Sequence, residues 1–215
     1  MRATIIADAS VNETLRLGGW ATWIKVDGIE AAMASGVFRV EVDNSFEAEA
    51  MAIANAIAAA ARNDMLDGVQ RLMIQSDSLQ VLIVLAKHIK GATVMDPLAG
   101  GSHIRRPKKP RWVRMTRRHP LVSESVKRIR ALKEEFGFAL ELRHVKGHMH
   151  ADPLATGAHR INALCDTEAR TARRKEEKRR REARQLERKL AALPAPESAP
   201  AAPSFSFNAP EETQL

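Results

Sequence analysis

The sequence has few of the residues that stabilise small secreted domains. Only Cys165 is a cysteine, which excludes a disulfide framework and a zinc site built from several cysteines. Tyrosine is absent and aromatic residues make up 4% of the 215 residues, whereas hydrophobic residues reach 45%. A core must therefore be built from Ala, Val, Ile, Leu and Met. The length suits one domain with appended segments.

The sequence also lacks signals for membrane insertion and export. It has no run of about 18 apolar residues, the length that a membrane-spanning helix requires. The N-terminal segment becomes acidic at Asp8, too early for a secretory signal peptide. We therefore expect a cytoplasmic protein.

Positive charge is concentrated in two segments. Residues 101–120 contain eight Lys or Arg and no acidic residue, and residues 170–190 contain eleven Lys or Arg and four Glu. Because the formal net charge is +8, the remaining residues together carry about −7. Clusters of Lys and Arg bind polyanions by releasing phosphate counterions, which favours nucleic acid as the partner. The alternative is that both segments are simply charged surface.

Five strands are predicted from short apolar or alternating segments that are bounded by turn residues. They are residues 2–8, 20–26, 36–42, 72–75 and 138–145.

Four helices are predicted from apolar residues at spacings of three and four. Asn44 or Ser45 can cap the first helix, and Gly137 suits the position after the third. The segment 91–120 contains Gly and Pro without a stable period, so a basic loop is expected there. The order β-β-β-α-β-α-α-β-α predicts an α/β fold with a mixed five-stranded sheet. The predicted helices are residues 45–62, 78–88, 122–136 and a last one from about 162.

Four carboxylates occupy positions that suit metal binding. Asp8 and Asp77 each follow a predicted strand, and Glu49 and Asp166 lie near the starts of predicted helices. Two Mg²⁺ ions about 4 Å apart need several oxygen ligands, and such pairs of ions catalyse phosphodiester hydrolysis. The alternative is that Asp8 and Asp77 only cap a turn and a helix.

Five motifs occur in one order along the chain, and together they resemble the type 1 ribonuclease H family. That family has the elements Asp-Gly-Ser, Ala-Glu-Leu, Thr-Asp-Ser, Val-Lys-Gly-His and Asn-x-x-x-Asp. The resemblance covers about residues 1–172 apart from the insertion at 91–120. Ala9 replaces the usual Gly, and Leu79 and Gln80 replace the Gln and aromatic residue often found after the third motif. The motifs in this chain are Asp8-Ala9-Ser10, Ala48-Glu49-Ala50-Met51-Ala52, Ser76-Asp77-Ser78, Val145-Lys146-Gly147-His148 and Asn162-Ala163-Leu164-Cys165-Asp166.

The resemblance implies an enzyme that uses two Mg²⁺ ions, or Mn²⁺, to cut the RNA strand of an RNA/DNA hybrid. It implies that Asp8, Glu49, Asp77 and Asp166 are the metal ligands. His148 would assist proton transfer and product release, a role that suits a side chain titrating near neutral pH. The implied substrate contacts are Ser10, Asn44, Ser45 and Asn162, and in the basic insertion Arg105, Arg106, Lys108, Lys109, Arg111 and Trp112.

Some assignments have alternatives in the sequence. Glu47 lies two residues before Glu49, about 200° away around the helix, so only one of them can face the site. Glu49 is preferred because Ala52, Ala56 and Ile57 then fall where the family keeps small or apolar residues. The spacing of His144, His148 and His150 could suggest zinc, but no cysteine assists. Cys165 is most simply a small buried hydrophobic residue.

The appended segments also allow more than one interpretation. Trp112 suits either stacking on a base or anchoring of its loop, and the basic run around it could pass for a nuclear import signal. Residues 173–193 predict a basic helical extension, in which Leu186, Leu190 and Leu193 could form a weak self-association seam. Residues 194–215 predict a disordered tail rich in Ala, Pro and Ser.

Three other functions remain open from the sequence. One is a ribonuclease H-like module that binds nucleic acid without cutting it. Another is a related two-metal nuclease, such as a junction resolvase. The last is a structural organiser of nucleic acid that uses only the basic helix.

Overall fold

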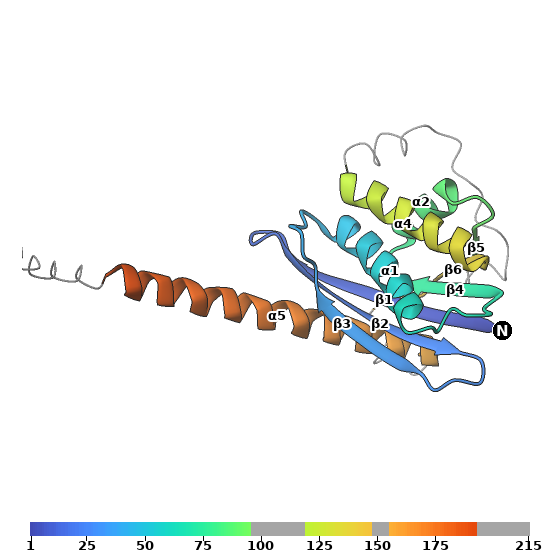
Figure 1. Cartoon of the computed structure of the whole chain (residues 1–215), viewed down its shortest axis with the longest axis horizontal. Coiled ribbons are helices and arrows are strands. Elements are labelled where there is room, and N and C mark those ends of the chain that lie inside the picture. Colours follow the sequence, from blue (N-terminus) through green and yellow to red (C-terminus); the bar gives the residue numbers. More distant parts are fainter. Residues whose placement is uncertain (96–118, 148–154, 193–215) are drawn as a thin grey trace, which may run out of the picture. The chain divides into compact units, whose positions relative to one another are not determined.

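The computed structural model describes residues 1–95, 119–147 and 155–192 (Figure 1). The chain divides after Lys178 into two compact units, and the sheet belongs to the first, Met1–Lys178. In these described ranges, no helix is both long and apolar enough to cross a membrane. The elements are, in order, β1 (Arg2–Asn12), β2 (Leu17–Val26), β3 (Ala32–Val37), α1 (Ser45–Arg62), β4 (Arg71–Ser76), α2 (Leu79–His88), β5 (Thr93–Met95), α4 (Pro120–Phe136), β6 (Ala139–His144) and α5 (Gly157–Ala191).

The sheet is mixed, as the element order predicts, and has the strand order β3-β2-β1-β4-β6-β5. The first three strands pair antiparallel, while β4 pairs parallel to β1 and to β6. The predicted count of five strands was wrong because Thr93–Met95 adds a sixth, parallel to β6. Three residues are too few to show an alternating pattern, and they form a strand because they pair with the edge of β6.

Three predicted elements also need corrected bounds. β1 continues beyond residue 8 to Asn12, because β2 pairs with it along its whole length, so Asp8 lies inside a strand opposite Ala21. β3 spans Ala32–Val37 rather than residues 36–42, because its pairing with β2 begins at Ala32, opposite Ile24, and ends at Val37, opposite Gly19. The last helix begins at Gly157, five residues before the predicted start.

Local sequence explains where the helices begin and end. Of the two predicted caps, Asn44 and Ser45, the Asn44 side chain caps α1 by accepting a hydrogen bond from the Glu47 backbone N–H at 3.0 Å. The Ala-rich sequence of α1 favours a helix and allows it to pack closely on the sheet. Helix α4 ends at Gly137, whose φ of 70° lies in the left-handed region that glycine adopts without strain.

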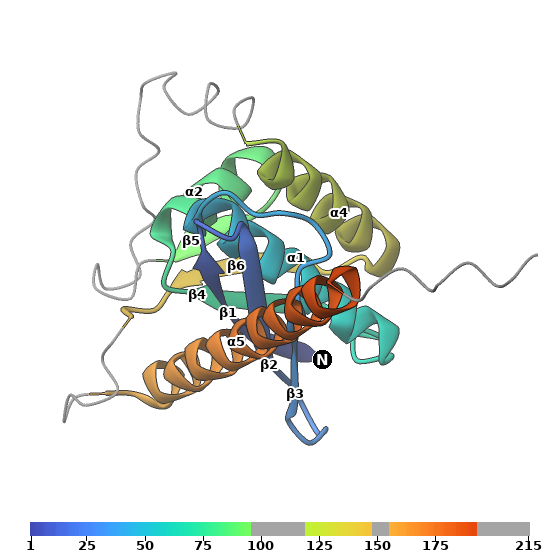
Figure 2. The same cartoon turned by 90° about the vertical axis from the view of Figure 1, so that its left-hand side faces the viewer.

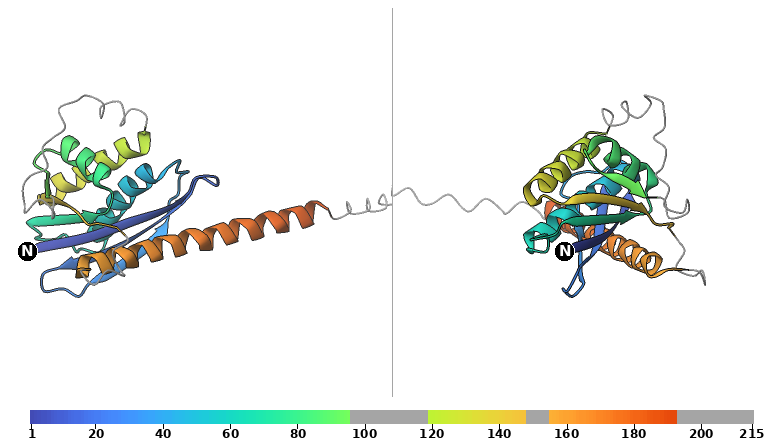
Figure 3. Two further views of the ribbon diagram at one scale, coloured as in Figure 1. Left: turned by 180° about the vertical axis from the view of Figure 1, so that it is seen from behind. Right: turned by 90° about the vertical axis from the view of Figure 1, so that its right-hand side faces the viewer.

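Helices cover both faces of the sheet. Helices α1, α2 and α4 lie on one face, and the part of α5 within the first unit lies on the other (Figures 2 and 3). The larger core, under α1, contains alternate β1 side chains such as Ile5 and Ala7. The smaller core contains Ile6 together with Cys165 and Ala169 of α5. Cys165 is fully buried, which confirms its interpretation as a small core residue.

Helix α5 approaches β2 closely at Gly19. A Cβ atom at this position would lie 2.3 Å from the Ala169 carbonyl oxygen and 2.9 Å from the Arg173 backbone nitrogen. Both obstructing atoms belong to the backbone, so only a shift of the helix could relieve the overlap. The glycine therefore sets the distance between the sheet and the helix.

We expect Gly19→Ala to lower the free energy of unfolding by about 1–3 kcal/mol, the usual cost of overpacking. Gly28→Ala is a useful comparison, because a Cβ there meets no atom within 4 Å although its φ of +76° is also unfavourable. Urea unfolding followed by circular dichroism measures both variants. A Gly19→Ala protein as stable as the wild type would contradict the close approach.

Beyond Lys178, the described residues of α5 are exposed. Leu186 and Leu190 are among them, with 59% and 57% of their surface accessible, and Leu193 lies outside the described residues. Self-association through these leucines stays a prediction.

Candidate metal centre

The register between β1 and β4 brings Asp8 and Asp77 together. The last residues that pair between these parallel strands are Ile6 and Gln75. Asp8 and Asp77 each follow two residues later, so the two aspartates lie at equivalent positions along neighbouring backbone segments. Asp8 is still held in β1 by its pairing with β2, whereas Asp77 follows the end of β4.

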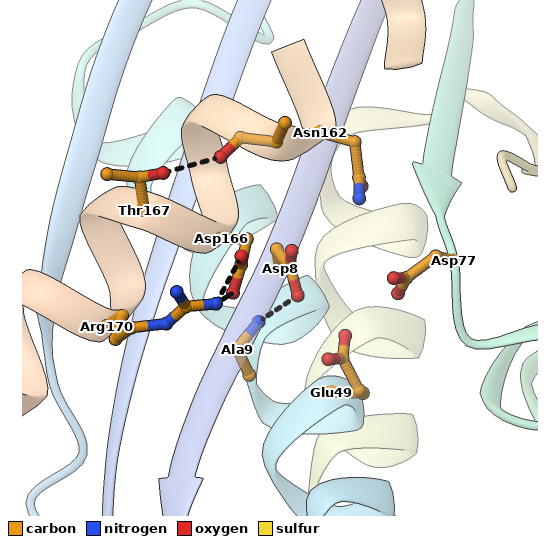
Figure 4. A pocket seen from close by; sticks show the side chains of 9 residues that line it. Asp8, Ala9, Glu49, Asp77, Asn162, Asp166, Thr167 and Arg170 are labelled. Carbon is orange, nitrogen blue, oxygen red and sulfur yellow. Dashed lines mark hydrogen bonds and ion pairs between the residues drawn. The ribbon is translucent and has the colours of Figure 1, made fainter. Parts of the chain in front are cut away.

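Glu49 reaches the same place from α1. It lies in the second turn of this helix, between the fully packed residues Ala48 and Ala50, and only 8% of its surface is exposed. One ligand oxygen each of Asp8, Glu49 and Asp77 can be chosen so that all three lie within 4.8 Å of one another. Figure 4 shows the three carboxylates converging from β1, α1 and the end of β4.

Glu47 points elsewhere. Its Oε2 accepts a hydrogen bond from Asn44 Nδ2 at 3.3 Å, and its Oε1 lies 3.5 Å from His119 Nδ1. The Glu47 carboxylate is therefore held at the start of α1 by the side-chain amide of the Asn44 cap and by its proximity to His119. Of the two glutamates that the sequence left as alternatives, the structure places Glu49 in the acidic cluster.

Burial makes the acidic cluster costly to ionise without a cation. It raises the pKa of Asp8 from 3.8 to about 7, and the charge of Asp77 adds to this effect. Burial also raises the pKa of Glu49 well above its ordinary value, with further contributions from the charges of Asp8 and Asp77. The Oε2 atom of Glu49 is buried and has no hydrogen-bond partner. The cluster is thus a place where positive charge would be strongly stabilised.

Helix α5 contributes the rest of the pocket. Asn162, Asp166 and Arg170 follow one another at intervals of four residues, so they lie on the same face of the helix. All three line a cavity of about 380 Å³ together with the acidic cluster. Asn162 is 3% exposed, and its Oδ1 has no hydrogen-bond partner. Asp166 is more accessible and binds Arg170, whose Nη2 donates to Asp166 Oδ1 at 2.9 Å and to Oδ2 at 2.6 Å.

The end of β6 and the residues just after it restrain Asp77. The His144 Nε2 donates a hydrogen bond to the Asp77 backbone oxygen at 3.0 Å. A Cβ atom on Gly147 would lie 2.5 Å from Asp77 Oδ2, so only glycine leaves that carboxylate in place. Packing against the Asp77 carboxylate therefore explains why the Val145-Lys146-Gly147-His148 motif has a glycine at this position.

The predicted substrate contacts differ in their surroundings. The Ser10 hydroxyl accepts a hydrogen bond from Arg173 Nε at 3.1 Å, and Arg173 also pairs with Glu177. Asn44 caps α1, and Ser45 is exposed beside it. The predicted proton-transfer residue His148 lies outside the described residues. So do the remaining predicted substrate contacts, which are Arg105, Arg106, Lys108, Lys109, Arg111 and Trp112.

Sequence reasoning missed Arg170, and it included Gly147 in a motif without indicating its contact with Asp77. The four-residue spacing of Asn162, Asp166 and Arg170 was readable as one helix face and could have indicated the ion pair. No local pattern indicates that Gly147 packs on Asp77, because the two residues are 70 positions apart.

No protein-family model matches the sequence, and no curated protein matches it. Solved structures do resemble the fold. The N-terminal RNase H domain of a Mycobacterium tuberculosis protein, solved as a fusion with maltose-binding protein, matches with a TM-score of 0.52 and 15% identity, over 82% of this chain and 96% of that one. RNase H1 from the halophilic archaeon Halobacterium salinarum gives a TM-score of 0.48 and 16% identity, over 80% and 97%. LC11-RNase H1, in complex with an RNA/DNA hybrid, gives 0.49 and 13%, over 81% and 98%.

The match to the mycobacterial domain shows that this chain has a ribonuclease H-like fold. The fold is the one that the sequence motifs predict.

Proposed function

We propose that the protein is a metal-dependent ribonuclease H that hydrolyses the RNA strand of RNA/DNA hybrids. The observation that carries this proposal is the convergence of Asp8, Glu49 and Asp77, from three distant parts of the chain, in one cluster in which Asp8 and Glu49 are buried and Asp77 is half-buried. The ribonuclease H-like fold supports it.

The residues present fit divalent cations. The donor set is made of carboxylate oxygens, which Mg²⁺ and Mn²⁺ prefer. The Oε2 atom of Glu49 is buried without a partner, and such an atom is costly unless a ligand satisfies it. Asp8, Glu49 and Asp77 would hold one ion, and Asp166 would help to hold a second. When bound, the two ions supply an activated water and stabilise the charge that develops on the leaving 3′ oxygen.

The protein's own side chains would bind and orient the substrate. Asn162 offers a buried, unpartnered amide oxygen at the wall of the cavity, which could accept a hydrogen bond from a ribose 2′-hydroxyl. Such a contact distinguishes RNA from DNA. Arg170 lines the same cavity and supplies a guanidinium that can contact a phosphate. His148, from its motif, would move a proton during the reaction.

A strand-specific assay tests this function. We expect the RNA strand of a doubly end-labelled hybrid to be cut, with 5′-phosphate and 3′-hydroxyl products, only when Mg²⁺ or Mn²⁺ is added. Asp77→Asn should abolish cutting while hybrid affinity changes little, because it removes one ligand charge from the cluster. Asp67→Asn, which changes an exposed aspartate in the loop before β4, is the matched control and should cut normally.

The assay also separates the alternatives. Binding of the hybrid without cutting at any metal concentration would indicate a non-catalytic module. Preferred cutting of a four-way DNA junction would indicate a resolvase. Normal cutting by Asp77→Asn would contradict the proposed metal site.

A further inference from the structure

Asp166 stands apart from the three-carboxylate cluster. It lines the same cavity as Asp8, Glu49 and Asp77, but it is not part of the group whose oxygens lie within 4.8 Å of one another. Figure 4 shows the carboxylate of Asp166 turned toward the guanidinium of Arg170. The fourth acidic residue of the pocket therefore already has a cation as its partner.

The bond between Arg170 and Asp166 is short but accessible to water. One nitrogen of Arg170 donates to both carboxylate oxygens, at 2.9 and 2.6 Å. The two side chains are 44% and 27% exposed. Ion pairs at such accessibility are weak because solvent screens them. A divalent cation, with twice the charge, can therefore compete with Arg170 for Asp166.

The backbone around Asp166 is packed against the sheet, so a change in the Asp166–Arg170 pair would involve the Arg170 side chain. Cys165 and Ala169, on either side of Asp166 in the helix, are fully buried against the sheet. Gly19 holds the helix at a fixed distance, and Arg173 ties the next turn to Ser10. Asp166 is consequently preset near the cluster, whereas Arg170 has a long, flexible and half-exposed side chain.

We propose that Arg170 is an internal counter-cation of Asp166 that the second divalent ion must displace. The site then loads in two steps: the Asp8, Glu49 and Asp77 cluster binds the first ion, and the second binds more weakly because Arg170 occupies Asp166. Arg170 is a positioning residue in this scheme, since it acts through Asp166. The inference rests on the metal site of the proposed function and adds an order of binding to it.

Calorimetric titration of Mn²⁺ into the metal-free, full-length protein tests the order directly, without any measurement of activity. For the wild type we expect one tighter and one weaker equivalent. Arg170→Gln should raise the affinity for the second ion by about fivefold, the factor that corresponds to the upper range for exposed ion pairs. It should change the affinity for the first ion by less than about twofold. Asp166→Asn should weaken or remove the second equivalent and leave the first.

Arg174→Gln is the matched control. Arg174 lies one turn beyond Arg170 on the same helix and is not among the residues that line the cavity. It gives the same change in net charge without releasing Asp166, so its titration should follow the wild type. If both variants bound the second ion more tightly to the same extent, net charge alone would explain the effect and the proposal would be overturned. Unchanged binding of the second ion in Arg170→Gln would also overturn it.

The same titration separates this inference from the proposed function. The metal site stands if the wild type binds Mn²⁺, if Asp77→Asn weakens binding of the first ion, and if the hybrid is cut. In that case, unchanged binding of the second ion in Arg170→Gln refutes only the displacement of Arg170. If the wild type binds no Mn²⁺ at all, the metal site fails, and the role of Arg170 fails with it.

Discussion

Glu49→Gln should abolish hybrid cleavage, whereas Glu47→Gln should leave it within a few-fold of the wild type. Glu49 contributes a buried carboxylate to the cluster with Asp8 and Asp77. Changes to groups that only support a metal ligand already cost about 10–100-fold, so loss of a ligand charge should cost more than about 100-fold. Initial rates of hybrid cleavage at saturating Mg²⁺ measure the difference.

Glu47 provides a close control because it is also buried and lies on the same helix. Its carboxylate accepts a hydrogen bond from the Asn44 side-chain amide and lies beside His119, and the amide oxygen of Gln can accept the same hydrogen bond. We expect a small loss of thermal stability in Glu47→Gln without a loss of chemistry. An inactive Glu47 variant beside an active Glu49 variant would mean that the α1 register described here is wrong.

Asp8→Asn should stabilise the metal-free protein while it destroys the metal site. Burial raises the pKa of Asp8 from 3.8 to about 7, so the folded chain holds this proton more tightly than the unfolded chain. The contribution of Asp8 to the free energy of unfolding therefore falls as the pH rises from about 4 to about 7. Asn cannot ionise and does not carry this cost.

We expect the Tm of Asp8→Asn, in the presence of EDTA, to exceed that of the wild type by about 5–10 °C near pH 7.5, because a rise of the pKa from 3.8 to about 7 corresponds to at most about 4 kcal/mol. The difference should shrink as the pH falls toward 4. Saturating Mg²⁺ should raise the wild-type Tm more than that of the variant, since a ligand that binds the folded state stabilises it.

Thermal unfolding by circular dichroism across this pH range gives the result, with Asp67→Asn as the control for an exposed aspartate. A wild type that gains stability relative to Asp8→Asn as the pH rises without metal would contradict the burial of an unfavourable charge at this position.

Much of this protein follows from its sequence alone. Local signals narrowed the cap of α1 to Asn44 or Ser45 and predicted the end of α4 at Gly137, because both depend on a few neighbouring residues. Apolar spacing predicted the α/β class and most of the elements. The motifs indicated which carboxylates to consider, although Glu47 and Glu49 could be separated only by resemblance.

The tertiary structure decided the relations between distant segments. The period of a strand shows which side chains share a face, but not which partner it has or in what register. The pairing of Ile6 with Gln75 therefore had to be observed before Asp8 and Asp77 could be placed side by side. The same holds for the strand β5, which exists only through its pairing with β6, and for the extension of β1 past Asp8.

The electrostatic state of the site is also a tertiary property. In the sequence, Asp8 and Glu49 are ordinary acidic residues, and folding buries them beside Asp77 and so raises their pKa values. Asp166 and Arg170, by contrast, are close in sequence. Their ion pair can affect the site only because the packing of α5 against Gly19 places it beside that cluster. Composition and spacing supplied the charged groups, and the register of the sheet set the distances between them, on which their energies depend.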